Sequence, residues 1–145
     1  MTIELKRAYE KPSAKDGARV LVDRLWPRGI KKSDARIQAW LRDLAPSTEL
    51  RQWFHEKNSP EFFPEFRKHY LQELNQPAAS SALQELYGLV GKNRTVTLIY
   101  ASKNDRQNNA TVLRDLLNGM RKPPTSSGPA RAAAAGAKRA RMSKP

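Results

Sequence analysis

The sequence predicts a small α/β protein with a mainly parallel sheet of about three strands, covered by about five helices. Three segments have side-chain patterns typical of strands, at positions 2–9, 19–25 and 95–101. Between the second and third of these lie about seventy residues whose apolar side chains recur at helical spacing. Since neighbouring parallel strands need a long crossover, this separation favours parallel pairing.

The three predicted strands differ in how deeply they should be buried. Residues 2–9 alternate apolar with charged side chains, the pattern of a strand with one buried face, and the turn-forming residues of 11–17 predict a loop. Residues 19–25 contain an unbroken Val-Leu-Val run, which predicts a central strand buried on both faces. Residues 95–101 combine β-branched side chains with a tyrosine, as strands do.

Helix-capping residues and prolines divide the intervening segment. Ser33 is a candidate N-cap for a helix that continues to Leu44 and stops before Pro46, and Ser47 can cap the next helix. A short turn at 60–63, a helix over 64–74, a helix over 80–90 closed by Gly91, and a last helix over 107–120 follow. The aromatic side chains fit core packing, because they recur at helical spacing: Trp40, Trp53, Phe54, Phe66 and Tyr70.

The net charge of +13 is distributed unevenly. Residues 121–145 contain seven basic and no acidic side chains, whereas the rest of the chain has 20 basic and 14 acidic ones. We therefore expect an α/β domain over 1–120, followed by a disordered basic tail over 121–145 that has nothing to bury. The tail makes weak, non-specific attraction to nucleic acid expected at low salt.

Several classes of function are excluded or disfavoured. The chain has no cysteine, so disulfide frameworks, thiolate metal sites and cysteine nucleophiles are excluded. His55 and His69 are the only histidines, and neither belongs to a recognised metal motif, so we expect no bound metal and no cofactor. The apolar runs are too short for a membrane span, and we expect a cytoplasmic protein with no membrane partner.

Polar side chains follow the two neighbouring central strands. Asp23, Arg24 and Arg28 follow one strand, and residues 102–105, which include Lys103, follow the other. The carboxyl ends of parallel strands share one edge of a sheet, where α/β proteins bind ligands. The last helix begins just beyond, and its free N–H groups would face the same edge. The sequence therefore predicts a site for a small phosphate- or carboxylate-bearing ligand.

Each residue of this predicted site has a candidate role. Arg24, Arg28 and Lys103 would bind the anion, and Asn108 would supply a hydrogen bond. Asp23 would orient an arginine or act as a catalytic base. Trp26 would form a hydrophobic lid or a stacking platform. The alternative is that these charges only pair with each other or with water.

The sequence resembles the YeaO-like proteins, a family that carries a domain of unknown function, in four segments: RVLVDRLWPRGIKK (19–32), LAPSTELRQWFH (44–55), FRKHYLQEL (66–74) and TLIYASKNDRQNNATVL (97–113). The segments cover nearly all of residues 2–118 in order, and DRLWPRG is close to diagnostic. The resemblance implies a small α/β domain without an established activity. It adds Ser47 and Arg51 to the candidate ligand-binding residues, although Ser47 by itself is explained as a helix cap.

One position departs from the family pattern. Asn109 stands where many relatives have a histidine after the Gln-Asn pair, and asparagine cannot serve as a general base near neutral pH. Three functions stay open: an anion pocket that could be an enzyme site, non-specific nucleic-acid binding through the basic tail and surface, and a structural or partner-binding module.

Overall fold

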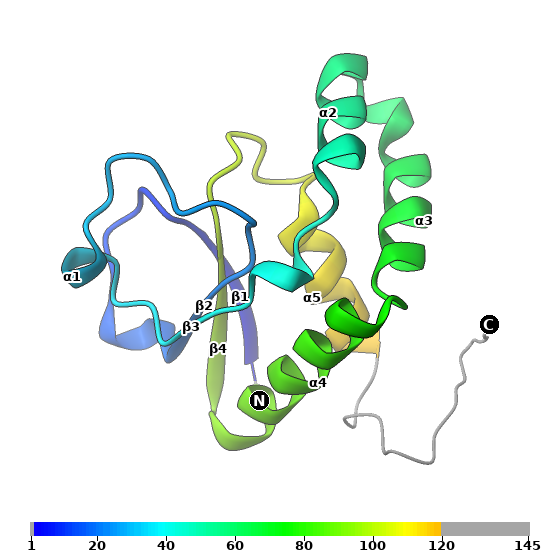
Figure 1. The fold of residues 1–145 in the computed structure, drawn as a ribbon. Coiled ribbons are helices and arrows are strands. Elements are labelled where there is room, and N and C mark those ends of the chain that lie inside the picture. Colours follow the sequence, from blue (N-terminus) through cyan, green and yellow to red (C-terminus); the bar gives the residue numbers. More distant parts are fainter. Residues whose placement is uncertain (1, 120–145) are drawn as a thin grey trace, which may run out of the picture.

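The computed structural model describes residues 2–119 and contains a four-stranded sheet (Figure 1). The strands are β1 (Thr2–Arg7), β2 (Ala18–Leu21), β3 (Ala39–Trp40) and β4 (Thr95–Tyr100). Their order across the sheet is β1-β4-β2-β3, and all three pairings are parallel. The α/β class and the parallel pairing of β2 with β4 are thus confirmed.

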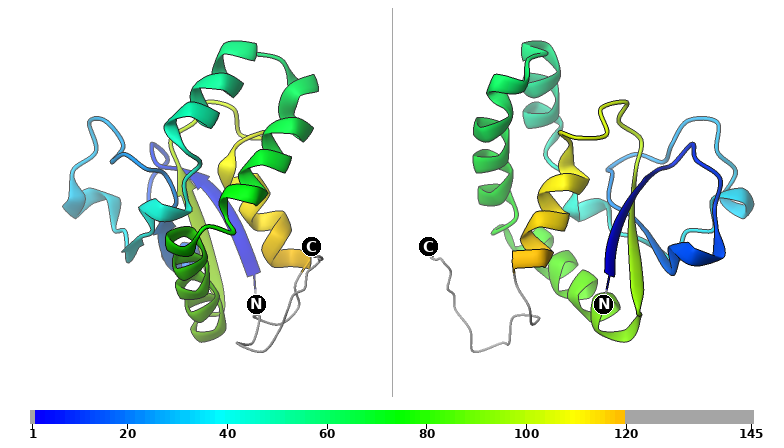
Figure 2. Two further views of the ribbon diagram at one scale, coloured as in Figure 1. Left: turned by 45° about the vertical axis from the view of Figure 1, so that its right-hand side comes forward. Right: turned by 180° about the vertical axis from the view of Figure 1, so that it is seen from behind.

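The longer helices all lie on one face of the sheet, as Figure 2 shows from two sides. They are α2 (Thr48–Lys57), α3 (Phe63–Glu73), α4 (Pro77–Lys92) and α5 (Asn109–Gly119). The other face is covered by the loops that precede and follow β2, together with the short helix α1 (Lys32–Ala35). The fold therefore has one thick, helical side and one thin side made of loops.

The two faces have separate apolar clusters because side chains alternate along each strand. Val20 of β2 and Val22, just beyond its end, join Val96, Leu98 and Tyr100 in the large core beneath the helices. Leu21 and Ile99 point the opposite way, into a small cluster with Ala8 that is flanked by Trp26, Ile37 and Trp40. All four residues of β2 are buried, as the Val-Leu-Val run predicted for a central strand.

A polar network occupies the thin side near the start of β2. The carboxylate of Asp16, in the 3-10 turn η1 (Ala14–Asp16), accepts hydrogen bonds from Lys6 Nζ over 3.1 Å and from Arg19 Nη1 over 2.6 Å. The hydroxyl of Thr97 donates to the Asp16 carbonyl over 2.7 Å. These bonds join β1, β2 and β4 to one turn, so the network stabilises the sheet where few apolar side chains cover it.

The predicted helix from Ser33 to Leu44 is wrong. Helix α1 ends at Ala35, because its C-cap residue Arg36 has a left-handed φ of 52°. The chain then forms β3, held by the backbone bonds Gln38 N–H to Arg19 O and Leu41 N–H to Leu21 O, both 2.9 Å. The 3-10 turn η2 (Arg42–Leu44) follows. This segment supplies a fourth strand. Its apolar side chains recur at helical spacing although they belong to the successive short elements α1, β3 and η2.

Other boundaries shift by a few residues. Helix α4 begins at Pro77, earlier than predicted, and continues through Gly91, which does not close it. Strand β2 ends at Leu21, before the predicted Leu25, and α5 begins at Asn109. The turn before α3 is confirmed as the 3-10 segment η3 (Pro60–Phe62). The predicted tail, residues 121–145, lies outside the described residues.

Candidate functional site at the carboxyl edge of the sheet

Asp23 is the central side chain at the carboxyl edge, just beyond the end of β2. Its Oδ2 accepts a hydrogen bond from the backbone N–H of Ala101 over 2.8 Å, which ties the end of β2 to the end of β4. Its Oδ1 accepts from the side-chain amide of Asn109 over 3.1 Å, and its carbonyl oxygen accepts from Trp40 Nε1 over 2.7 Å. One residue thus joins two strand ends, β3 and α5.

Burial raises the pKa of the Asp23 carboxyl above its ordinary value of 3.8. The hydrogen bonds from Ala101 and Asn109 and the positive charge of Arg51 act in the opposite direction, but they do not offset the effect of burial. Arg51 belongs to α2, so the charge of this helix acts on the Asp23 carboxyl. The site therefore contains a partly buried acid beside an exposed cation.

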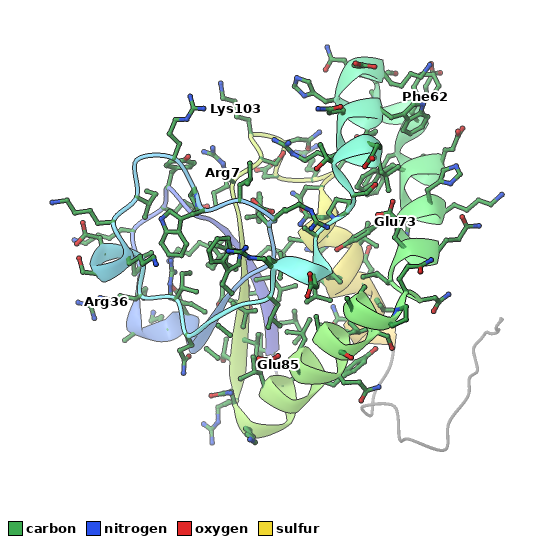
Figure 3. All side chains as sticks on the ribbon, in the orientation of Figure 1. Arg7, Arg36, Phe62, Glu73, Glu85 and Lys103 are labelled. Atoms are coloured by element: carbon green, nitrogen blue, oxygen red, sulfur yellow. The ribbon has the colours of Figure 1, made fainter. Side chains whose placement is uncertain are left out.

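A second acid, Glu73 of α3, lies at the start of α2. Its Oε1 accepts from the backbone N–H of Ser47 over 2.7 Å, and its Oε2 accepts from the Ser47 hydroxyl over 2.6 Å (Figure 3). The Ser47 oxygen in turn accepts from the backbone N–H of Leu50 over 3.1 Å, so Ser47 is the predicted N-cap of α2. A carboxylate is favourable here because the N-terminus of a helix carries partial positive charge.

The charges of both acids act on the phenol of Tyr70, on α3. It is completely buried, and its hydroxyl donates to the Leu44 carbonyl oxygen. Burial, and then the charges of Asp23 and Glu73, raise the pKa of the Tyr70 phenol well above 10.0. The phenol consequently stays protonated and serves as a fixed hydrogen-bond donor.

The remaining predicted cations are exposed. Arg24 reaches across to the Ala45 carbonyl oxygen over 3.3 Å, close to Ser47. Arg28 and Lys103 have no side-chain hydrogen bond or ion pair among residues 2–119, and Figure 3 shows Lys103 on the loop after β4. The structure thus groups Asp23, Arg24, Ser47 and Arg51, whereas Arg28 and Lys103 project from separate loops at the same edge.

Trp26 and Asn108 make bonds that hold the neighbouring loops. The Trp26 indole donates to the Ile30 carbonyl over 2.6 Å and packs edge-on against Trp40, with ring centroids 5.5 Å apart. Trp26 thereby packs against the small apolar cluster on the thin side of the sheet. Asn108 Oδ1 accepts from the Thr111 N–H over 2.9 Å, and Asn108 Nδ2 donates to the Asn104 carbonyl over 2.7 Å, so its amide caps α5.

Sequence reasoning missed four residues of this site. Asn109, noted only as a departure from the family pattern, holds Asp23. Glu73 and Tyr70 lie inside the FRKHYLQEL segment, whose family resemblance was the one available signal. Arg7, at the end of β1, donates to the carbonyls of Ala101 and Ser102, which secures the loop after β4 (Figure 3).

A hollow of about 620 Å³ lies elsewhere, on the thin side of the sheet, and no predicted site residue lines it. Among residues 2–119, no group of three acidic or histidine side chains could hold a metal ion. Within the same range, every helix is too short or too polar to cross a membrane.

Comparisons with known proteins assign the family. The family model described as "Inactive DUF488-N3 subclade" matches residues 2–131. The chain belongs to this family. The uncharacterised protein YeaO of Escherichia coli K12 is 42% identical over 120 residues, which cover 83% of this chain and 100% of YeaO. The YeaO-like resemblance is thereby confirmed.

Mycobacterial members of this group are equally similar. The uncharacterised proteins Mb3100c of Mycobacterium bovis and Rv3073c of Mycobacterium tuberculosis are each 45% identical over 117 residues, covering 81% of this chain and 94% of their own. No solved structure matches the chain.

Proposed function

We propose that the protein binds a small molecule carrying a phosphate or carboxylate group at the carboxyl edge of the sheet, and that it does so without catalysing a reaction. One observation carries the proposal: the acids of the site are occupied in holding the fold, while its arginines present donors to solvent. The description of the family as an inactive subclade agrees with a binding role.

The acids and the hydroxyl of the site already have partners. Asp23 accepts from Ala101 and Asn109, and Glu73 accepts twice from Ser47. A general base must be free to take a proton from a substrate, and a serine nucleophile needs a base beside it that is not a structural acceptor. Asn109 cannot replace a histidine in that role.

The cations have unused hydrogen-bonding capacity. A guanidinium has five N–H donors, of which Arg24 uses one, at Ala45, and Arg51 uses none among residues 2–119. Both side chains belong to exposed residues around the start of α2. Forked donors of this kind suit phosphate and carboxylate groups, and the loop cations Arg28 and Lys103 add positive potential at the same edge.

Ligand-induced stabilisation tests the proposal. Thermal unfolding is measured with a panel of phosphorylated and carboxylated metabolites for the wild type, Arg51→Ala and Arg28→Ala. The matched control is Arg67→Ala, an exposed arginine on α3 that is not among the proposed ligand-binding residues. We expect at least one compound to stabilise the wild type and the control, with affinity about tenfold lower in Arg51→Ala. Equal stabilisation of all four proteins would refute the site.

A second candidate, non-specific nucleic-acid binding, is favoured by the charge distribution. Residues 2–42 contain 11 basic and 5 acidic side chains, whereas residues 43–119 contain 9 of each, so the net charge of the folded part belongs to its first third. Replacing the seven tail cations by glutamine in the full chain separates the sources. If the variant still binds DNA with a steep salt dependence, the binding belongs to residues 2–42. If the variant no longer binds DNA, the binding belongs to the tail.

A further inference from the structure

The thin side of the sheet has an opening that is separate from the carboxyl edge. It has a volume of about 620 Å³ and lies between two loops of the thin side, residues 11–17 and residues 33–38. Ligand pockets commonly measure about 300–1,000 Å³, so the opening has the size of a small-molecule site. Figure 3 shows Arg36 beside α1, on this side of the sheet.

Arg19 of β2 lines the hollow, although its side chain is only 4% exposed. Its Nε donates to the Ala35 carbonyl oxygen over 2.9 Å, and its Nη1 donates to Asp16 Oδ2 over 2.6 Å. A guanidinium has five N–H donors, so three have no acceptor among residues 2–119. Leaving buried donors without acceptors costs free energy, and an oxyanion in the hollow would satisfy them.

The charge of Arg19 is not fully balanced within the network. The Asp16 carboxylate is shared between Arg19 and Lys6, so one negative charge meets two positive ones. Lys11 and Arg36 add two exposed cations to the lining, against one acid, Asp34. The hollow therefore carries an excess of positive charge over a buried guanidinium, which suits an anionic group of one or two charges.

The rest of the lining offers neutral hydrogen-bonding groups. Ser13, Ser33 and Gln38 supply hydroxyl and amide groups, and Pro12, Ala14 and Gly17 supply small apolar surface. A ligand body with hydroxyl groups and a compact, partly apolar frame matches such walls. A phosphorylated sugar has both the charge and the hydroxyls.

Arg36 gives the hollow a strained wall. It is the only arginine with positive φ among residues 2–119, at 52°, a conformation that costs a side-chain-bearing residue free energy. The backbone around it is held because Arg19 Nε binds the Ala35 carbonyl and the Gln38 N–H donates to the Arg19 carbonyl over 2.9 Å. The guanidinium in the hollow and the loop that closes it are thus parts of one structure.

We infer that the hollow between residues 11–17 and 33–38 is a second binding site, which takes the phosphate or carboxylate of a small polyhydroxylated molecule against Arg19, with Lys11 and Arg36 on either side. This site is distinct from the proposed carboxyl-edge site. Asp23 lies four residues beyond Arg19 in the chain, which corresponds to roughly 13 Å along an extended strand.

Nuclear magnetic resonance titration of the full-length protein tests the inference, with inorganic phosphate, ribose 5-phosphate and acetate as probes. We expect saturable shifts of the Arg19 Nε–H, the Gln38 side-chain amide and the Ser33 amide, with ribose 5-phosphate binding more tightly than phosphate. Acetate distinguishes a carboxylate site from a phosphate site. Shifts confined to Lys103, Asn108 and their neighbours would overturn the inference and instead support the carboxyl-edge site.

Variants that remove positive charge from the lining provide a second test of the inference. Lys11→Gln and Arg36→Asn remove the flanking cations without touching the Arg19 ion pair, and asparagine tolerates the positive φ at position 36. Lys32→Gln, an exposed lysine on α1 outside the lining, is the control. We expect ribose 5-phosphate to bind about tenfold more weakly to each hollow variant than to the wild type. The control should bind it as tightly as the wild type does. Unchanged affinity in both hollow variants, or no saturable shift with any probe, would overturn the inference.

Discussion

Asn109 and Asp23 are 86 residues apart in the chain, yet the amide of the first donates to Oδ1 of the second over 3.1 Å. The same Asn109 nitrogen also donates to the Val22 carbonyl oxygen over 2.9 Å. The first residue of α5 therefore holds the end of β2 in place. Asn109 thus makes structural hydrogen bonds that fix the end of β2, and its amide cannot serve as a general base.

Asn109→Ala should destabilise the protein by about 1–3 kcal/mol, because the buried Val22 carbonyl and the Asp23 carboxylate both lose a donor. Urea unfolding measures the difference. Asn118→Ala, on an exposed position of the same helix, is the control and should change stability by less than about 0.5 kcal/mol. Equal effects at the two positions would mean that the Asn109 bonds contribute nothing.

Asp16→Asn should destabilise the protein by about 3–5 kcal/mol at pH 7, since Arg19 would keep its buried charge without the carboxylate. Burial opposes ionisation of Asp16, but hydrogen bonds from Ser13, Lys6 and Arg19 outweigh it and lower its pKa below 3.8. The stability that ionised Asp16 adds is fully present above pH 3.8 and is lost as the pH falls through the lowered pKa. Denaturant unfolding from pH 7 to pH 2 should show that the difference in unfolding free energy between the wild type and Asp16→Asn shrinks at the acid end.

Asp23 should give a pH dependence of the opposite sign. Burial raises its pKa above 3.8, so the folded state binds the proton more tightly than the unfolded chain does. The stability that this tighter proton binding contributes is fully present below pH 3.8 and is lost as the pH rises through the folded-state pKa. The stability of the wild type relative to Asp23→Asn should therefore increase on acidification toward 3.8. A difference that stays flat from pH 7 to pH 3 would contradict the raised pKa.

Gly17→Ala should destabilise the protein by more than about 2 kcal/mol. Gly17 has a φ of 64°, and an added Cβ would overlap the carbonyl oxygen of Thr95. Gly88 is a matched control, because it lies inside α4 and an added Cβ would meet nothing within 4 Å beyond the helix's own nearby backbone. Gly88→Ala should stabilise the protein by about 0.5–1 kcal/mol. Melting temperatures of the two variants should move in opposite directions.

Ser47→Ala should cost about 1–2 kcal/mol, because α2 loses its N-cap and Glu73 loses the hydroxyl it accepts from. Circular dichroism during urea unfolding gives the value. Ser81→Ala, at an exposed position in α4, should be neutral or slightly stabilising because alanine favours helix. A loss at Ser81 as large as that at Ser47 would show that the cap has no special effect.

Local patterns were enough for most elements. The Val-Leu-Val run identified a buried central strand, Ser47 identified a helix start, and Pro60 and Pro64 identified the turn before α3. These signals operate within a few residues of the chain, through hydrogen bonds and backbone restrictions that sequence alone displays. The shared carboxyl edge followed from the long crossover between β2 and β4.

Contacts between distant segments could not be predicted. Strand β3 has only two residues, and it exists because Arg36 turns the chain and the backbone of β2 accepts its hydrogen bonds. Its apolar spacing fitted a helix equally well. The hydrogen bonds between Glu73 and Ser47 join residues 26 positions apart, and no sequence pattern around either residue predicts them.

The amino-acid sequence by itself determined the α/β class, the family and the edge of the sheet where charged side chains gather, because period, capping and crossover length are properties of neighbouring residues. Only the tertiary structure decided what those side chains do. It paired Asp23 with Asn109 and Glu73 with Ser47, and it placed Arg19 beneath a hollow on the opposite end of β2. The reason is physical: a buried polar group must find its partner across the fold, and the choice among distant partners is made by packing.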